Sequence, residues 1–127
     1  MARWEIKNVR LVGVSAAVPK NIVKTADFDF FTTEEAETFD KTVGIKSRRL
    51  ASEDICASDM CQSAAERLLA DLGWEKDSID VLIFESVTGD YKTPPTSCIL
   101  QDRLELPESC FCMDIPMGCC GCMYAIN

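Results

Sequence analysis

The last eighteen residues, 110–127, constrain the fold more than any other part of the chain. They read Cys-Phe-Cys-Met-Asp-Ile-Pro-Met-Gly-Cys-Cys-Gly-Cys-Met-Tyr-Ala-Ile-Asn. This pattern predicts a short apolar strand over 109–115, a tight turn through Pro116 and Gly118, and a helix that begins at Cys119. The unpaired N–H groups at a helix N-terminus favour a thiolate over a thiol, so a cysteine at such a corner is suited to nucleophilic chemistry. Cys119 is therefore the candidate nucleophile.

The composition is that of one globular domain over residues 1–127. These 127 residues are enough to bury a core, and 47% of them are hydrophobic while 27% are charged. Twenty-one acidic residues against thirteen basic ones give a formal charge of -8, which disfavours nucleic acid or an anionic membrane as a partner. No run approaches the roughly 20 apolar residues of a membrane span, and the N-terminus lacks a signal-peptide core. We therefore expect a cytoplasmic protein.

The chain contains eight cysteines, which in a reducing cytosol are most simply free thiols. Five of them lie between positions 110 and 122, and Cys119 and Cys122 form a C-x-x-C motif. A metal or iron–sulfur site needs four converging thiolates. Strand alternation places Cys110 and Cys112 on one face, so a cluster of these two side chains with Cys119 and Cys122 stays open as an alternative. A redox role for the C-x-x-C motif stays open as well. The same strand positions are where core side chains belong, and we predict no metal and no cofactor.

Three apolar segments predict the strands of one sheet. Residues 3–17 are rich in β-branched and apolar types and predict a central strand. The continuous apolar run 79–84 predicts a strand near 80–88 that helices cover on both sides. The strand over 109–115 is the third, and a loop over 88–96 leads to a helix over 97–104. Strands that alternate with helices in this way predict an α/β domain.

Two further helices carry clear start and stop signals. The first begins at Thr33 with acidic residues in its first turn and ends at Gly44. The second, over 56–72, is the clearest helix of the chain, because its apolar side chains recur three and four residues apart and a glycine follows as a C-cap. We expect Cys56 at the start of this helix and Cys61 on its buried face.

Four ordered stretches carry a resemblance to a known family. They are Val43-Gly-Ile-Lys-Ser-Arg-Arg49, Ala57-Ser-Asp59, Thr88-Gly-Asp90 continued through Pro94-Pro-Thr-Ser-Cys98 to Leu100-Gln-Asp-Arg-Leu104, and Asp114-Ile-Pro-Met-Gly-Cys-Cys-Gly-Cys-Met-Tyr-Ala125. In order and spacing they resemble the β-ketoacyl-acyl-carrier-protein synthase III group of the thiolase-like superfamily. The resemblance covers nearly the whole chain. It implies a three-layer α/β/α fold of which this chain is an incomplete N-terminal half.

The resemblance also implies a chemistry and a set of partners. Cys119 falls on the catalytic cysteine, which takes an acyl group from a thioester while its backbone N–H helps to hold the oxyanion. Gly118 and Gly121 flank this residue and allow close approach of the backbone to substrate. The implied partners are an acyl carrier protein and acyl thioesters, and the implied assembly is a homodimer through residues 109–115. Thr93 replaces a bulky residue that relatives lend to the acyl pocket of the other subunit, which favours a longer or bulkier acyl chain.

The chain departs from this family at several positions. Synthase III enzymes that use coenzyme A carry a Trp and an Arg where this chain has Thr38 and Thr42, and neither threonine can stack on a purine. Priming by a carrier-protein-bound thioester, or by a thioester of another kind, is then favoured. Lys46, Arg48 and Arg49 form the only tight basic cluster in the sequence for docking an acidic carrier protein. The position of Cys122 is more commonly aromatic.

The family pairs its catalytic cysteine with a His and an Asn from the second half of a duplicated fold. This chain contains no histidine. We therefore expect either a piece of a synthase III-like acyltransferase that lacks condensation activity by itself, or a non-catalytic remnant that dimerises. The retained nucleophile corner at Cys119 favours the first hypothesis.

Overall fold

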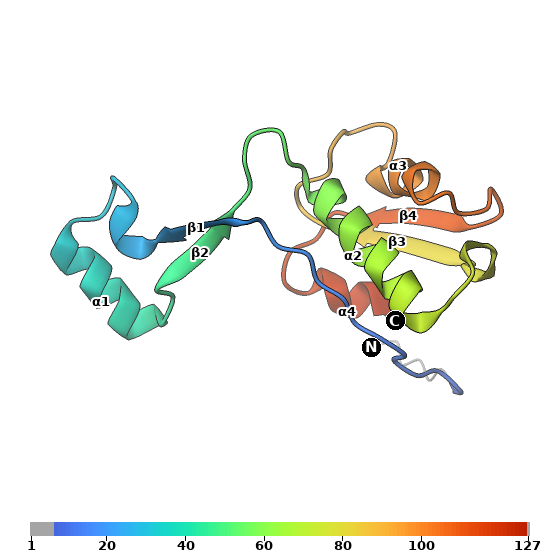
Figure 1. Cartoon of the computed structure of the whole chain (residues 1–127), viewed down its shortest axis with the longest axis horizontal. Coiled ribbons are helices and arrows are strands. Elements are labelled where there is room, and N and C mark those ends of the chain that lie inside the picture. Colours follow the sequence, from blue (N-terminus) through green and yellow to red (C-terminus); the bar gives the residue numbers. More distant parts are fainter. Residues whose placement is uncertain (1–6, 127) are drawn as a thin grey trace, which may run out of the picture.

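The structure, a computed structural model, describes residues 7–126 and is organised around two parallel strands (Figure 1). Strand β3 (Val81–Glu85) pairs with strand β4 (Phe111–Ile115) in register from Val81 and Phe111 to Glu85 and Ile115. Parallel neighbours need a crossover, and here helix α3 (Thr96–Arg103) supplies it and contacts both strands. The predicted strands 80–88 and 109–115 are thus confirmed, each slightly shorter than expected.

The helices form layers around this strand pair. Helix α2 (Ala57–Leu72) contacts α3, and the short helix α4 (Gly121–Ile126) contacts β3. Figure 1 shows α3 above and α4 below the strands. A short 3-10 helix, η2 (Lys76–Ser78), leads from α2 into β3. The arrangement is the predicted α/β fold, built here on two of the three predicted strands.

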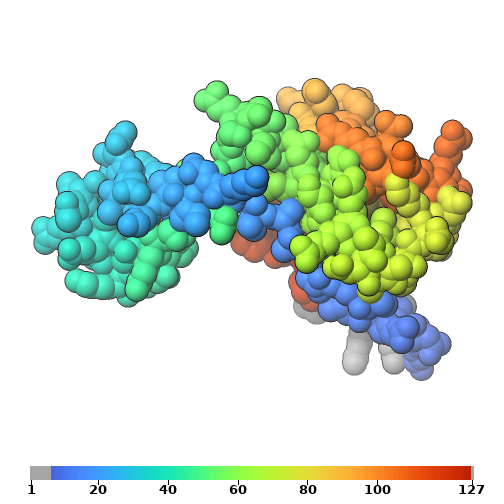
Figure 2. Space-filling view, viewed as in Figure 1, coloured from blue at the N-terminus to red at the C-terminus, as the bar shows by residue number. Residues whose placement is uncertain are grey.

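Residues 20–50 form a second unit at the other end of the long axis of the molecule. Strands β1 (Asn21–Lys24) and β2 (Ser47–Leu50) pair antiparallel, and the 3-10 helix η1 (Thr25–Asp27) and helix α1 (Thr33–Val43) lie between them in the chain. Figures 1 and 2 show this unit as a lobe that stands away from the β3 and β4 pair.

The predicted helix ends are confirmed by their caps. Helix α1 starts with a capping box, in which the backbone N–H of Thr32 donates to Glu35 Oε2 at 2.9 Å and the N–H of Glu35 donates back to Thr32 Oγ1 at 3.3 Å. Gly44 ends α1 with φ 78°, and Gly73 ends α2 with φ 63°. Both glycines adopt the left-handed conformation that a residue with a Cβ adopts only with strain.

The core is small and lies between the strand pair and α3. Its members are the buried apolar side chains that lose almost all exposure to solvent: Phe84, Leu100, Leu104, Leu106 and Cys110. Leu100 retains only 2% of its exposed surface. Because α3 supplies Leu100 and leads to Leu104, this helix is the element around which the core is built.

The predicted strand over 3–17 is wrong for the residues that are described, and residues 3–6 lie outside them. From residue 7 to residue 19 the backbone joins no strand, and Leu11 remains 84% exposed. The segment instead runs along α2, where an added Cβ on Gly13 would come within 2.9 Å of the side chain of Leu68. Apolar and β-branched residues favour a strand, but a strand also needs a neighbour with free N–H and C=O groups. No described segment provides that neighbour.

The predicted apolar stripe of α2 is only half buried. Leu68, Leu69 and Leu72 are partly covered, and Cys61 is exposed, so its expected place on a buried face is wrong. Cys56, predicted at the start of this helix, is its N-cap residue, and it is exposed as well. The predicted periodicity of the stripe is right. Residues 7–19 cover the stripe as a single segment, however, and leave part of it in contact with solvent.

Within residues 7–126, none of the helices combines the length and the apolar character that crossing a lipid bilayer requires.

The position of the core predicts which leucines matter for stability. We expect Leu100→Ala to lower the free energy of unfolding by about 2–5 kcal/mol, because it removes apolar contacts and leaves a cavity. Leu11→Ala removes the same atoms from an exposed site and should change the free energy by less than about 0.5 kcal/mol. Urea unfolding followed by circular dichroism measures both. Equal losses in the two variants would show that the core lies elsewhere.

Candidate active site at the carboxyl end of strand β4

The candidate site lies where the two parallel strands end together. In open parallel sheets, ligands bind beyond the carboxyl ends of the strands, because the connecting loops meet there. Here the N–H of Ser86, the first residue after β3, donates to the carbonyl oxygen of Ile115 at the end of β4, at 3.2 Å. The loop that follows β3 and the turn that follows β4 therefore start side by side.

The predicted strand, turn and helix at Cys119 are present, with the helix starting later than expected. After β4, the N–H of Met117 donates to the carbonyl of Ile115 at 2.9 Å, and the N–H of Gly121 donates to the carbonyl of Gly118 at 2.8 Å. Cys119 lies in this turn and is exposed, and α4 begins at Gly121. The start predicted at Cys119 is wrong by two residues, because the N–H of Gly121 is used to close the turn.

The two glycines beside Cys119 differ in their surroundings. Gly121 is buried, and an added Cβ would come within 2.6 Å of Cγ of Glu85, so a larger residue there would force the Glu85 side chain to move. A Cβ added to Gly118 would meet open space. Packing within the chain therefore explains Gly121, while the predicted substrate-facing roles of Gly118 and Gly121 stay predictions.

The loop after β3 forms a cavity next to the turn. The cavity has a volume of about 540 Å³, and it is lined by Ser86, Val87, Gly89, Asp90, Tyr91, Lys92, Pro95, Asp114 and Pro116. Thr93 lies in the same loop, is exposed, and precedes Pro94 through a cis peptide bond. Its predicted role in the acyl pocket of a second subunit stays a prediction.

Asp114 ties the end of β4 to the start of α3. Its two carboxylate oxygens accept hydrogen bonds from the backbone N–H groups of Thr96 at 2.7 Å and of Ser97 at 2.8 Å. These are orphan donors of the first turn of α3, which a carboxylate satisfies well. Burial acts to raise the pKa of Asp114, but the hydrogen bonds from Ser97 and Thr96 outweigh it, and the pKa lies below its ordinary value.

A second polar network ties the loop after β3 to α2. The hydroxyl of Ser58, which is fully buried, donates to Oδ2 of Asp90 at 2.5 Å, and the N–H of Asp90 donates to Thr96 Oγ1 at 3.1 Å. Arg103 donates to Ser58 Oγ at 3.1 Å and to Asp59 Oδ1 at 3.0 Å. The partners come from helices and loops far apart in the chain, so the sequence carries no local signal for this network.

Two cysteines of the C-terminal stretch, Cys110 and Cys112, are structural in character. Cys110 belongs to the buried core, and burial together with the neighbouring Cys110 thiol raises the pKa of Cys112 to about 11. Among residues 7–126, no group of three or more His, Cys, Asp and Glu side chains is placed to hold a metal ion. The four-thiolate cluster considered from the sequence therefore has no geometric support.

The basic cluster and the two threonines lie in the lobe of residues 20–50. Arg48 stacks near Phe39, with its guanidinium carbon 5.6 Å from the ring centroid, and Arg49 donates to the carbonyl of Pro19 at 2.9 Å. The hydroxyls of Thr38 and Thr42 donate to backbone carbonyls of α1, each at 2.8 Å. Both threonines are exposed and line a shallow cavity with Phe39.

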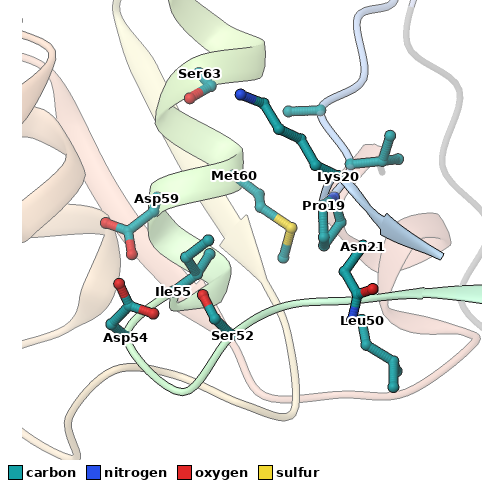
Figure 3. A pocket seen from close by; sticks show the side chains of 12 residues that line it. Pro19, Lys20, Asn21, Leu50, Ser52, Asp54, Ile55, Asp59, Met60 and Ser63 are labelled. Atoms are coloured by element: carbon teal, nitrogen blue, oxygen red, sulfur yellow. The ribbon is translucent and has the colours of Figure 1, made fainter. Parts of the chain in front are cut away.

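A further cavity lies apart from Cys119, between the two lobes. It has a volume of about 750 Å³ and opens between residues 17–21, the end of β2 and the start of α2 (Figure 3). Its lining mixes apolar side chains, such as Met60 and Ile55, with the charged Asp54, Asp59 and Lys20. None of the residues that the sequence singled out as catalytic or substrate-binding lines this cavity.

Solved structures define the class of fold. A 3-oxoacyl-(acyl-carrier protein) synthase from Burkholderia xenovorans LB400 superposes with a TM-score of 0.88 and 42% identity, and the match covers 92% of this chain and 34% of that one. A 3-oxoacyl-[acyl-carrier-protein] synthase III from Aquifex aeolicus VF5 gives a TM-score of 0.80 at 27% identity, covering 90% of this chain and 36% of that one. The fold is that of an incomplete thiolase-like domain.

Curated relatives show the same similarity over most of this chain. The β-ketoacyl-[acyl-carrier-protein] synthase III of Geobacillus kaustophilus is 34% identical over 116 residues, which are 91% of this chain and 37% of the relative. The enzyme of the same name from Staphylococcus epidermidis strain RP62A is 36% identical over 119 residues, which are 94% of this chain and 38% of the relative. No protein-family model matches the chain. The predicted resemblance is confirmed: the chain is a homologue of the β-ketoacyl-[acyl-carrier-protein] synthase III group and spans little more than a third of the length of these relatives.

The environment of Asp114 predicts a dependence of stability on pH. A carboxylate with a lowered pKa contributes stability that is fully present above the ordinary value of about 3.9 and is lost as the pH falls through the lower folded value. We expect Asp114→Asn to lower the free energy of unfolding at pH 7 by about 1–3 kcal/mol, since it replaces charge-assisted bonds to two backbone donors. The difference from the unmodified chain should shrink as the pH falls below about 4.

Urea unfolding at a series of pH values measures this difference. Asp29→Asn is the matched control, because Asp29 is exposed and lies in the other lobe, and it should leave the free energy of unfolding nearly unchanged. A difference for Asp114→Asn that stayed constant down to acid pH would contradict the charged form as the source of the stability.

Proposed function

We propose that the Cys119 thiol accepts an acyl group from a thioester, as the first step of a synthase III-like acyl transfer. The observation that supports this most strongly is the placement of one exposed thiol. Cys119 occupies the turn directly beyond β4, at the edge where parallel sheets bind ligands, and it does so within the stretch that resembles the family's nucleophile segment. A nucleophile must be reachable by its substrate, and this sulfur is.

The backbone of the turn suits the oxyanion that such a transfer forms. Attack of the thiolate on the thioester carbonyl gives a tetrahedral intermediate, and collapse of this intermediate releases the leaving thiolate and leaves the acyl group on sulfur. In the backbone hydrogen bonds of residues 7–126, the N–H groups of Cys119 and Cys120 are not donors, whereas the next one, from Gly121, is used. Two neighbouring N–H groups are thus available to hold the developing negative charge.

We assign acyl transfer to this chain and not the condensation that follows it in the family. The resemblance places a His and an Asn at the carbanion step, and the chain contains no histidine. We also propose a carrier-protein-bound thioester as the acyl donor. The hydroxyls of Thr38 and Thr42 are bound to the helix backbone, and the exposed side chains of Lys46 and its neighbours Arg48 and Arg49 offer positive charge to an acidic carrier protein. Thr93 leaves the pocket open to bulky acyl groups.

The acylation proposal predicts one covalent adduct. We expect the reduced chain, incubated with an acyl thioester, to gain one acyl group at Cys119, and Cys119→Ser to lose this adduct, because a serine hydroxyl is a far weaker nucleophile than a thiolate. Cys120→Ser is the matched control, since it alters the neighbouring exposed thiol and should leave the adduct unchanged. Intact-mass and peptide mass spectrometry locate the acyl group. An adduct spread evenly over the exposed cysteines, or none, would count against an enzymatic role.

A homodimer through β4 is the second part of the proposal. Within residues 7–126, β4 pairs only with β3, and its other edge carries free N–H and C=O groups that can pair with another strand. Phe111 on this strand is 58% exposed and Met113 is 39% exposed. The same surface favours the second candidate function, a dimerising remnant without catalysis, and the acylation experiment separates the two.

The open edge predicts a dimer in solution. We expect the chain to elute as a dimer at high micromolar concentration, and Phe111→Glu to shift it toward monomer, because a charge there disfavours burial of the strand face. Phe30→Glu is the matched control, since Phe30 is 69% exposed in the other lobe. Size-exclusion chromatography with light scattering measures the mass. A monomer at all concentrations would rule out the dimer.

A further inference from the structure

The turn after β4 carries more than one exposed thiol. Cys119, Cys120 and Cys122 are all free and exposed, whereas Cys110 is buried and Cys112 is partly buried. The acyl transfer proposed above uses only Cys119. The other two exposed thiols therefore stand beside a nucleophile without a role in its reaction.

The backbone of the turn brings one of them next to Cys119. The bond from the N–H of Gly121 to the carbonyl of Gly118 at 2.8 Å is followed by a bond from the N–H of Met123 to the carbonyl of Cys120 at 3.1 Å. Two overlapping four-residue turns of this kind, over residues 118–121 and 120–123, give the segment a helical path. On such a path, residues three apart are neighbours, with Cβ atoms about 5–6 Å apart, while residues one or two apart do not face each other. Cys119 and Cys122 are three apart, and Cys120 faces neither.

We propose that Cys119 and Cys122 form a reversible intramolecular disulfide, with Cys122 acting as the resolving thiol of the nucleophile. A disulfide needs Cβ atoms about 3.5–4.5 Å apart, so the two side chains must approach by only an ångström or two. Cys119 lies in the turn before α4, and Cys122 is the second residue of that helix. Apart from Gly121 and Ala125 the residues of α4 are exposed, so few contacts oppose a small movement of these two side chains.

The oxidant has to be supplied, and glutathione disulfide fits the chemistry. The thiolate of one cysteine attacks a sulfur of glutathione disulfide, which breaks that S–S bond, forms a mixed disulfide and releases one glutathione thiolate. The thiolate of the other cysteine then attacks the protein sulfur of the mixed disulfide and releases the second glutathione thiolate. Two protein thiols lose two electrons and two protons, and glutathione disulfide becomes two glutathione thiols.

The remaining cysteines of this stretch do not compete for the pairing. Cys110 is only 5% exposed. Burial keeps the pKa of Cys112 near 11, so at neutral pH this thiol is almost entirely protonated and a poor nucleophile. The disulfide would therefore form within the turn and leave the core of the strand pair unchanged. It would also remove the Cys119 thiol from reaction with thioesters.

Oxidation of the reduced chain tests the pairing. We expect incubation with glutathione disulfide, followed by blocking of the remaining thiols with iodoacetamide, to give a species that has lost two hydrogens, with the disulfide mapped to Cys119 and Cys122 by fragmentation of the tryptic peptide that follows Arg103. Cys122→Ser should instead retain glutathione on Cys119, and Cys120→Ser should behave like the unmodified chain. Retention of glutathione in the unmodified chain to the same extent as in Cys122→Ser, or loss of the disulfide in Cys120→Ser, would overturn the proposal.

A second readout separates this proposal from the acylation on which its regulatory consequence rests. The reduced chain should be acylated at Cys119, the oxidised chain should lose that acylation, and dithiothreitol should restore it. If the reduced chain is never acylated, the proposed function fails while the disulfide mapping still decides the pairing. If oxidation forms the disulfide but acylation continues unchanged at Cys119, the pairing does not occupy the nucleophile and the proposal fails.

Discussion

The carboxylate of Asp114 is the interaction on which the arrangement of the candidate site depends. It lies one residue before the end of strand β4 and caps helix α3, by accepting hydrogen bonds from the N–H groups of Thr96 and Ser97. Helix α3 in turn supplies Leu100 to the core. One charged group therefore ties the carboxyl end of β4, after which the turn that carries Cys119 begins, to the start of α3.

The polar contacts around this carboxylate form a chain that spans several elements. Thr96 links Asp114 to Asp90 in the loop after β3, and Asp90 links that loop to Ser58 in α2. Buried hydrogen bonds of this kind help to specify one arrangement, although within the described residues Asp90 Oδ1 and Ser97 Oγ are buried here without a hydrogen-bond partner. The small apolar core leaves much of the specification to these hydrogen bonds. The arrangement of the candidate site thus depends more on hydrogen bonds than the apolar content of the chain suggests.

Features with local causes could be predicted from the sequence. The ends of α1 and α2 follow from a capping residue and from Gly44 and Gly73, and each signal acts within a few residues of where it is read. The strand, turn and helix around Cys119 follow from apolar, proline and glycine residues in one short stretch. These predictions were confirmed to within two residues because their causes are contained in the segment itself.

Features with distant causes could not be predicted. The capping of α3 by Asp114 joins residues 18 apart in the chain, and the bond from Ser58 to Asp90 joins residues 32 apart. The strand expected over 3–17 failed for the same reason, since its own residues favour a strand but a pairing neighbour must come from elsewhere. The exposure of Cys61 depends on how completely residues 7–19 cover α2. Residue propensity determines which secondary structure a segment favours. Neighbours from elsewhere in the chain determine whether that structure forms.

The surroundings of each cysteine determine whether its thiol is covered or in contact with solvent. The strand places Cys110 in the core and keeps Cys112 partly covered, where burial disfavours the thiolate. The turn leaves Cys119 and Cys122 in contact with solvent, where a thiolate keeps its hydration and its access to electrophiles. The two pairs are separated by fewer than ten residues, and the end of β4 at Ile115 lies between them. The sheet therefore covers the sulfur atoms before this point, and the turn beyond it leaves those that follow available for chemistry.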